Sequence, residues 1–158
     1  MSHMVFVPMT WEEAVALRSG TAADGYQGCA ATPGLIASME SETLIEEAEY
    51  AALSCAGALA LVLKPTSPRL VAAAEVQNEQ LTDLGGSLGE VQVRGLSWHQ
   101  VRALFADEPA ALEAARLASE VVAEQSLAAA LAAPEVGAVL DGYDLLWFAP
   151  DELDQLMP

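Results

Sequence analysis

Positive charge is the scarcest property of this sequence. Only six lysines and arginines stand against 23 aspartates and glutamates, which gives a formal net charge of −17 with neutral histidines. Proteins that bind nucleic acid use clustered cations to displace counterions from the phosphates, whereas the cations here are spread along the chain. We therefore expect no nucleic-acid partner and no attraction to anionic membranes, and we expect a charged protein partner to have a basic surface.

The sequence also lacks a hydrophobic run long enough to cross a bilayer. The longest apolar run, residues 51–63, is shorter than the about 20 residues that a spanning helix needs, and we interpret it as a buried helix. No export signal is visible at the start, where we interpret residues 1–3 as a cloning remnant. These observations predict a cytoplasmic protein with no membrane partner and a single globular domain over residues 4–158.

Metal-ligating and nucleophilic side chains are few. The two cysteines, Cys29 and Cys55, form no CxxC motif, and we expect reduced thiols that pack in the core, with a redox pair as the alternative. His99 is the only histidine beyond residue 3, which leaves a poor ligand set for zinc. Because phosphate-binding and nucleophile motifs are also missing, the sequence predicts no metal and no cofactor, and it favours a protein that is not an enzyme.

Strand and helix patterns alternate along the chain. Short β-rich or apolar runs predict strands near 5–7, 29–32, 70–76, 90–94 and 143–149. The continuous apolar run 70–76 suits a strand that is covered on both faces, with a helix as the alternative, and the alternation in 90–94 predicts a half-exposed strand. Periodicity and start signals predict helices near 10–18, 35–39, 43–63 and 107–133, and a further helix that begins at 97. The polar, glycine-containing segments 19–27 and 77–89 are predicted loops. The pattern predicts an α/β or α+β sandwich, a single layered domain with about five strands and flanking helices.

Local signals refine three of these helices. Thr10 with Glu13, and Thr43 with Glu46, match the capping box that opens a helix. The helix over 107–133 carries its charged side chains on one side, so we expect its other side to lie on the sheet.

The densest group of ionisable side chains lies in the first turns of the helix over 43–63. Its carboxylates and a tyrosine could bind a cation or a basic protein surface, or they could simply favour the positive end of the helix dipole. At a second position, the large apolar side chain of Trp98 is followed by the imidazole of His99. No catalytic residue can be assigned. The candidate interaction or ligand face therefore comprises Glu46, Glu47, Glu49, Tyr50, Trp98 and His99.

Core packing is the default expectation for the large aromatic side chains, Trp98 included. Trp11, Trp98, Trp147 and Phe148 are apolar anchors, and exposure of any of them would indicate an interface.

Four segments together carry a resemblance to a known family: residues 5–8, 46–52, 69–76 and 145–148. With these segments the sequence resembles, over nearly its whole length, a family of short acidic actinobacterial proteins of unknown function. The resemblance implies a stand-alone cytoplasmic domain of an actinobacterium, and it implies no activity, cofactor or catalytic residue. It leads us to expect tyrosine after Trp147, where this chain has Phe148.

Three functions fit these observations. The first is a non-enzymatic interaction or regulatory module whose negative charge steers it toward a basic protein partner. The second is a small-molecule-binding protein or enzyme that uses acidic residues, which requires a concave pocket. The third is an acidic mimic of nucleic acid, which requires carboxylates in phosphate-like rows. A homodimer is compatible with all three.

Overall fold

The computed structural model describes residues 2–21, 23–39, 44–65 and 68–158. In these residues the chain forms a seven-stranded sheet in the order β4-β5-β2-β1-β3-β6-β7, and each neighbouring pair is antiparallel. The expected mixture of helices and strands is confirmed, whereas about five strands was too few. The strands are β1 Ser2–Pro8, β2 Gly25–Ala30, β3 Leu70–Gln77, β4 Leu81–Asp83, β5 Glu90–Arg94, β6 Val101–Ala106 and β7 Leu146–Phe148.

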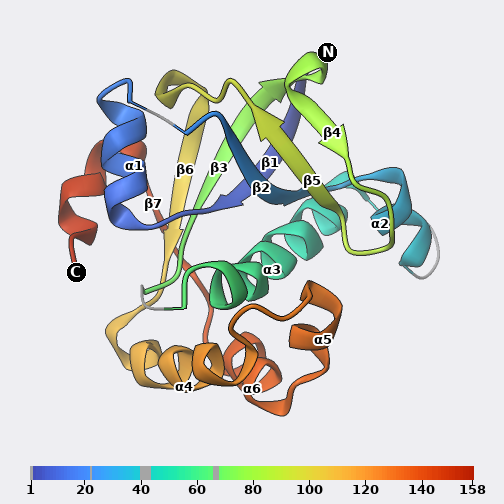
Figure 1. Cartoon of the computed structure of the whole chain (residues 1–158), viewed down its shortest axis with the longest axis vertical. Coiled ribbons are helices and arrows are strands. Elements are labelled where there is room, and N and C mark those ends of the chain that lie inside the picture. Colours follow the sequence, from blue (N-terminus) through green and yellow to red (C-terminus); the bar gives the residue numbers. More distant parts are fainter. Residues whose placement is uncertain (1, 22, 40–43, 66–67) are drawn as a thin grey trace.

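Helices cover both faces of this sheet. The α-helices are α1 Trp11–Arg18, α2 Pro33–Ser38, α3 Ile45–Leu63, α4 Leu112–Val122, α5 Leu127–Ala132 and α6 Pro134–Gly142, and the 3-10 turns are η1 Asn78–Gln80, η2 Trp98–Gln100, η3 Pro109–Ala111 and η4 Pro150–Leu156. Helix α3 lies along one face, and α4, α5 and α6 pack on its far side, whereas α1 and η4 lie on the other face (Figure 1). Within the described residues, no helix is both long and apolar enough to span a bilayer.

Helix α3 is buried on two sides, and this position explains the longest apolar run of the sequence. The predicted buried helix is confirmed, and its end at Leu63 is as expected. Small buried side chains, such as Ala52, Ala56 and Ala60, allow the sheet to approach on one side and α4 to α6 on the other. Of the predicted capping pair Thr43 and Glu46, Thr43 lies outside the described residues.

Strand β3 lies near the middle of the sheet and is covered on both faces, as its continuous apolar run predicts. Val71 and Ala73 belong to the core under α3, whereas Leu70 and Ala72 belong to the core under α1 and η4. The half-exposed strand predicted at 90–94 is confirmed as β5, in which buried and partly exposed residues alternate.

Strands β4 and β6 contradict two expectations. The segment 77–89 is not a continuous loop, because η1 and β4 lie within it and β4 forms a hairpin with β5. Gly85 and Gly86 both have φ of +80° in the connecting turn, a conformation that glycine adopts without steric cost. The expected helix at 97 is only the turn η2, because the next residues pair as β6 with β3 and β7. Likewise, β2 begins at Gly25, inside a predicted loop.

The helix expected over 107–133 is divided into α4 and α5. Glu124 has φ of 66° just after α4, and the Ser126 side chain then caps α5 by accepting a hydrogen bond of 3.1 Å from the Ala129 backbone. The break lets both helices fold back onto α3, so that Val122 and Leu127 reach the same core. Helix α4 therefore packs chiefly on α3 and α6 rather than on the sheet.

This break generates a stability prediction. A positive φ costs about 1 kcal/mol for a residue with a side chain, and Glu124→Gly removes this cost. Because glycine also gives the unfolded chain more conformational entropy, the net gain in the free energy of unfolding should be about 0.5 kcal/mol. The control Ala128→Gly, at an exposed position inside α5, should lower it by about 1 kcal/mol. Urea denaturation compares the two, and equal losses would contradict the strain at Glu124.

The capping box predicted at Thr10 and Glu13 is confirmed, and it carries a pH dependence. Burial raises the pKa of Glu13, but hydrogen bonds from the Thr10 backbone (2.9 Å) and from Lys64 (Nζ to Oε1, 2.9 Å) outweigh it, so the net pKa is lowered. A lowered folded-state pKa contributes stability above the unfolded pKa, and this stability is lost as pH falls through the folded pKa.

Glu13→Gln should therefore lower the free energy of unfolding by about 0.5–1 kcal/mol at pH 7, and the difference from the wild type should vanish in acid. Denaturation curves at several pH values test this expectation. The control Glu12→Gln changes an exposed acid of the same helical turn. A loss that is equally large in acid would show that shape, not charge, carries the effect of Glu13.

Candidate functional site

A buried ion pair lies below the candidate site, and its arginine forms part of the floor. Leu70 of β3 pairs with Ala106 of β6 at the end of the ladder, so the flanking residues Arg69 and Asp107 leave the sheet opposite each other. Their side chains are 2% and 0% exposed. Arg69 donates from Nε to Oδ1 at 3.1 Å and Oδ2 at 3.0 Å, and from Nη2 to Oδ1 at 2.5 Å. A buried charge pair of this kind is electrically neutral as a unit and costly to break.

A pocket of about 500 Å³ opens above this pair, beside α3. Its deepest lining groups, Arg69, Gly57 and Phe6, are buried, whereas Tyr50 and Asp144 at its mouth are exposed. Sheet, α3, α6 and the connection from α6 to β7 all contribute walls, so the pocket exists only in the folded chain. The lining residues are Phe6, Glu46, Glu49, Tyr50, Leu53, Ser54, Gly57, Arg69, Phe105, Leu140, Tyr143, Asp144 and Leu145.

One face of α3 supplies much of this lining. Glu46, Tyr50, Leu53 and Gly57 follow one another at spacings of three or four residues, which places them on the same side of a helix. Glycine at the deep end leaves room for the guanidinium, since a Cβ on Gly57 would lie 3.2 Å from Nη1 of Arg69. The face thus runs from carboxylates at the mouth to the buried cation at the floor.

The six residues of the predicted face lie in different places. Glu46, Glu49 and Tyr50 line the pocket, whereas Glu47 is exposed on α3 and is not part of the lining. Trp98 is half-buried against the core on the opposite face of the sheet. His99 is exposed beside it, and its carbonyl accepts a hydrogen bond of 2.7 Å from Arg102.

The polar groups of the pocket suit an organic cation better than a metal ion. Glu46, Glu49 and Asp144 come from two separate parts of the chain, and nowhere in residues 2–21, 23–39, 44–65 and 68–158 do three His, Cys, Asp or Glu side chains gather as a metal site would need. Tyr50 and Tyr143 add ring faces that attract ammonium groups. The arrangement can hold a positive charge at the mouth, next to walls of apolar side chains.

The two cysteines lie in the core under α3. Both thiols are buried and free. Burial raises the pKa of both, and the neighbouring Cys55 and Glu90 raise the pKa of Cys29 further. Thiols held protonated in this way are poor nucleophiles.

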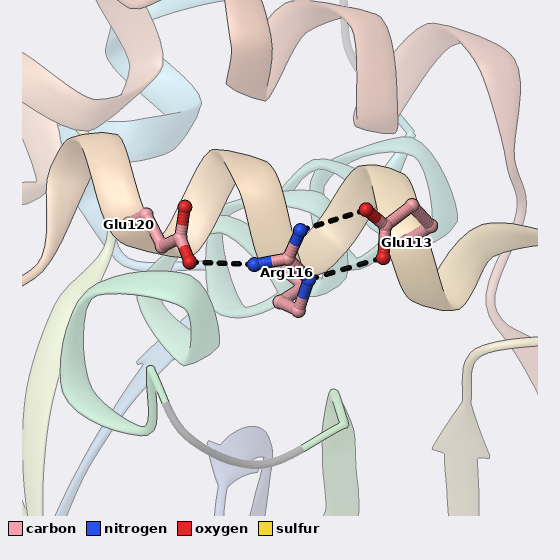
Figure 2. A network of polar contacts seen from close by, with 3 residues as sticks. All are labelled: Glu113, Arg116 and Glu120. Atoms are coloured by element: carbon pink, nitrogen blue, oxygen red, sulfur yellow. Dashed lines mark hydrogen bonds and ion pairs between the residues drawn. The ribbon is translucent and has the colours of Figure 1, made fainter.

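Charged residues on α4 neutralise one another instead of forming a site. Arg116 donates to Glu113 from Nε at 3.0 Å and from Nη2 at 2.7 Å, and from Nη1 to Glu120 at 2.5 Å (Figure 2). The hydrogen bonds to Arg116 lower the pKa of Glu113 and those to Glu113 raise the pKa of Arg116. These exposed contacts follow helical spacing, and the expected solvated side of this helix is confirmed.

One tryptophan departs from its expected place. Trp11 and Phe148 are half-buried, and the Trp11 indole donates to the Leu153 carbonyl at 2.9 Å. Trp147, on the edge strand β7, is instead 61% exposed, so the expectation of core packing is wrong for it.

Comparison with known proteins identifies a family. Residues 3–157 match the model of a family of unknown function, DUF6912. The chain belongs to this family. The predicted resemblance to a family of unknown function over nearly the whole chain is therefore confirmed, and the matched residues include those that line the pocket. No curated protein and no solved structure matches the chain.

Sequence reasoning missed the deep half of the site. Arg69 and Asp107 each stand at the end of an apolar strand, and Gly57 interrupts an apolar helix, which are positions where a buried charge or a close approach can occur. These signals do not say which partner each residue meets. Tyr143 and Asp144 fall at the start of the strand predicted near 143–149, but β7 begins only at Leu146, and these two residues lie in the connection that borders the pocket.

The ion pair generates a testable prediction. Arg69→Met leaves the buried Asp107 carboxylate uncompensated and should lower the free energy of unfolding by about 3–5 kcal/mol. The double variant Arg69→Met with Asp107→Leu removes both charges and should recover most of that loss. Chemical denaturation measures both. A single variant that loses less than about 1 kcal/mol would contradict the burial of this pair.

Proposed function

We propose that this protein is a non-catalytic binding module whose pocket beside α3 accepts a small organic cation. The observation that carries the proposal is that Glu46, Glu49 and Asp144 all line one hollow with a buried floor. A volume of about 500 Å³ is of the size that small-molecule sites use. The apolar walls suit a hydrocarbon body, and the mouth suits a positive charge.

Binding is favoured over catalysis by the way the polar groups are placed. An activated nucleophile needs a base within hydrogen-bond reach. In the described part of the chain, no hydrogen bond joins Ser54, Tyr50 or Tyr143 to a carboxylate or an imidazole. The free thiols lie in the core rather than in the lining.

The first expectation from the sequence, a basic protein partner, shares the chemistry of this proposal. A lysine side chain presents the same ammonium group as a small amine, so both occupants would meet the carboxylates at the mouth. The concave shape that α3, α6 and the sheet give the pocket favours the small molecule. A nucleic-acid mimic would need its acids in rows on a convex surface, whereas these three acids surround a hollow.

Calorimetric titration with n-octylamine tests the proposal directly. Octylamine should bind with salt-sensitive affinity, and the neutral n-octanol should bind at least 10-fold more weakly, because it has no charge for the carboxylates. Glu46→Gln and Glu49→Gln should each weaken octylamine about 3- to 10-fold.

Glu47→Gln is the matched control. Glu47 has the same charge, lies on the same helix and is exposed, but it does not line the pocket, so its variant should change the affinity less than about 2-fold. An end-blocked lysine peptide, titrated in parallel, separates a protein partner from a small amine. Equal binding of amine and alcohol, or equal effects of all three substitutions, would refute the proposed function.

A further inference from the structure

The floor of the pocket holds a hydrogen-bond donor that the proposed binding of a cation does not use. Arg69 is 3% exposed, and Asp107 engages its Nε and Nη2. Its third nitrogen, Nη1, has no hydrogen-bond partner in the described part of the chain. Among the described residues, every side-chain nitrogen or oxygen that is closed off from solvent has a hydrogen-bond partner. Because Nη1 has none, it is not closed off, and it faces a cavity.

That cavity is the pocket beside α3. Arg69 also borders a second, apolar pocket of about 340 Å³ under the C-terminal residues, but Gly57 lines only the first. A Cβ built on Gly57 would meet Nη1 at 3.2 Å and the Leu145 side chain, also in the first lining, at 3.5 Å. The free N–H groups of Arg69 therefore face the deep end of the pocket next to α3.

The charge around this donor decides what it can accept. Asp107 already neutralises the guanidinium, and the three carboxylates at the mouth are negative. These acids would repel a ligand carboxylate, and the neutralised guanidinium offers no net positive charge to offset that repulsion. A neutral carbonyl oxygen can accept a hydrogen bond from Nη1 without being repelled.

We propose that the ligand is an elongated amine whose far end carries a neutral oxygen acceptor, such as an amide, with its ammonium group at the carboxylates and its carbonyl at Nη1 of Arg69. This inference rests on the proposed function and names the ligand class of the same site. The helix sets the length: Gly57 lies seven and eight residues after Tyr50 and Glu49, which corresponds to about 10–12 Å along α3.

Three compounds of one chain length test the inference by calorimetry on the whole protein: 8-aminooctanamide, n-octylamine and 8-aminooctanoate. The amide should bind about 10-fold more tightly than octylamine, because it adds a hydrogen bond to a charged donor, and the carboxylate should bind more weakly than the amide. If octylamine binds as tightly as the amide, the inference is overturned while the proposed function stands. If none of the three binds, the proposed function fails as well.

Gly57→Ala supplies the second arm without breaking the ion pair. Alanine favours the helix, but its methyl group occupies the space beside Nη1, so the amide should lose its advantage and bind within about 2-fold of octylamine. The acids at the mouth are unchanged, so octylamine itself should keep most of its affinity. An amide advantage that persists in this variant, or an equal loss for both compounds, would overturn the assignment of Nη1 as the donor.

Discussion

The buried ion pair between Arg69 and Asp107 is the constraint on which the rest of the site depends. It joins the ends of β3 and β6, and its arginine borders both the pocket beside α3 and the second pocket under the C-terminal residues. A buried arginine must satisfy its donors, and a single carboxylate can satisfy only part of the guanidinium. The nitrogen left over gives the pocket a polar floor, which an apolar core would not provide.

The packing around α3 follows from the small size of its side chains. Alanine and glycine allow the helix to lie between the sheet and the layer of α4, α5 and α6, so the same helix both holds the core and forms a wall of the pocket. Its first turns extend beyond the core and carry Glu46, Glu49 and Tyr50 to the mouth. Core-facing and pocket-facing positions thus alternate along one helix, because its faces have different neighbours.

The strong negative charge of the chain has more than one role in the structure. On α4, Glu113 and Glu120 bracket Arg116 in contacts of ordinary helical spacing that stay in solvent (Figure 2). At the mouth of the pocket, the carboxylates instead stand around a hollow. The density of acids in the sequence cannot distinguish these situations, because it does not tell which acids already have a cation beside them.

The sequence by itself determined the local features: the buried α3, the capping box of α1, the two-sided burial of β3 and the half-exposed β5, all of which depend on periodicity or on residues within one turn. Only the tertiary structure decided that 101–106 is a strand, that α4 stops at Val122, and that Tyr143 and Asp144 line the same pocket as α3. Strand pairing and helix packing join residues far apart in the chain, and their free energy overrides local start signals such as that at Ser97. For the same reason Glu46, Glu49 and Tyr50 of the lining could be selected from one helix, whereas Gly57 and Arg69 at the floor, and the Asp107 that pairs with Arg69, could not.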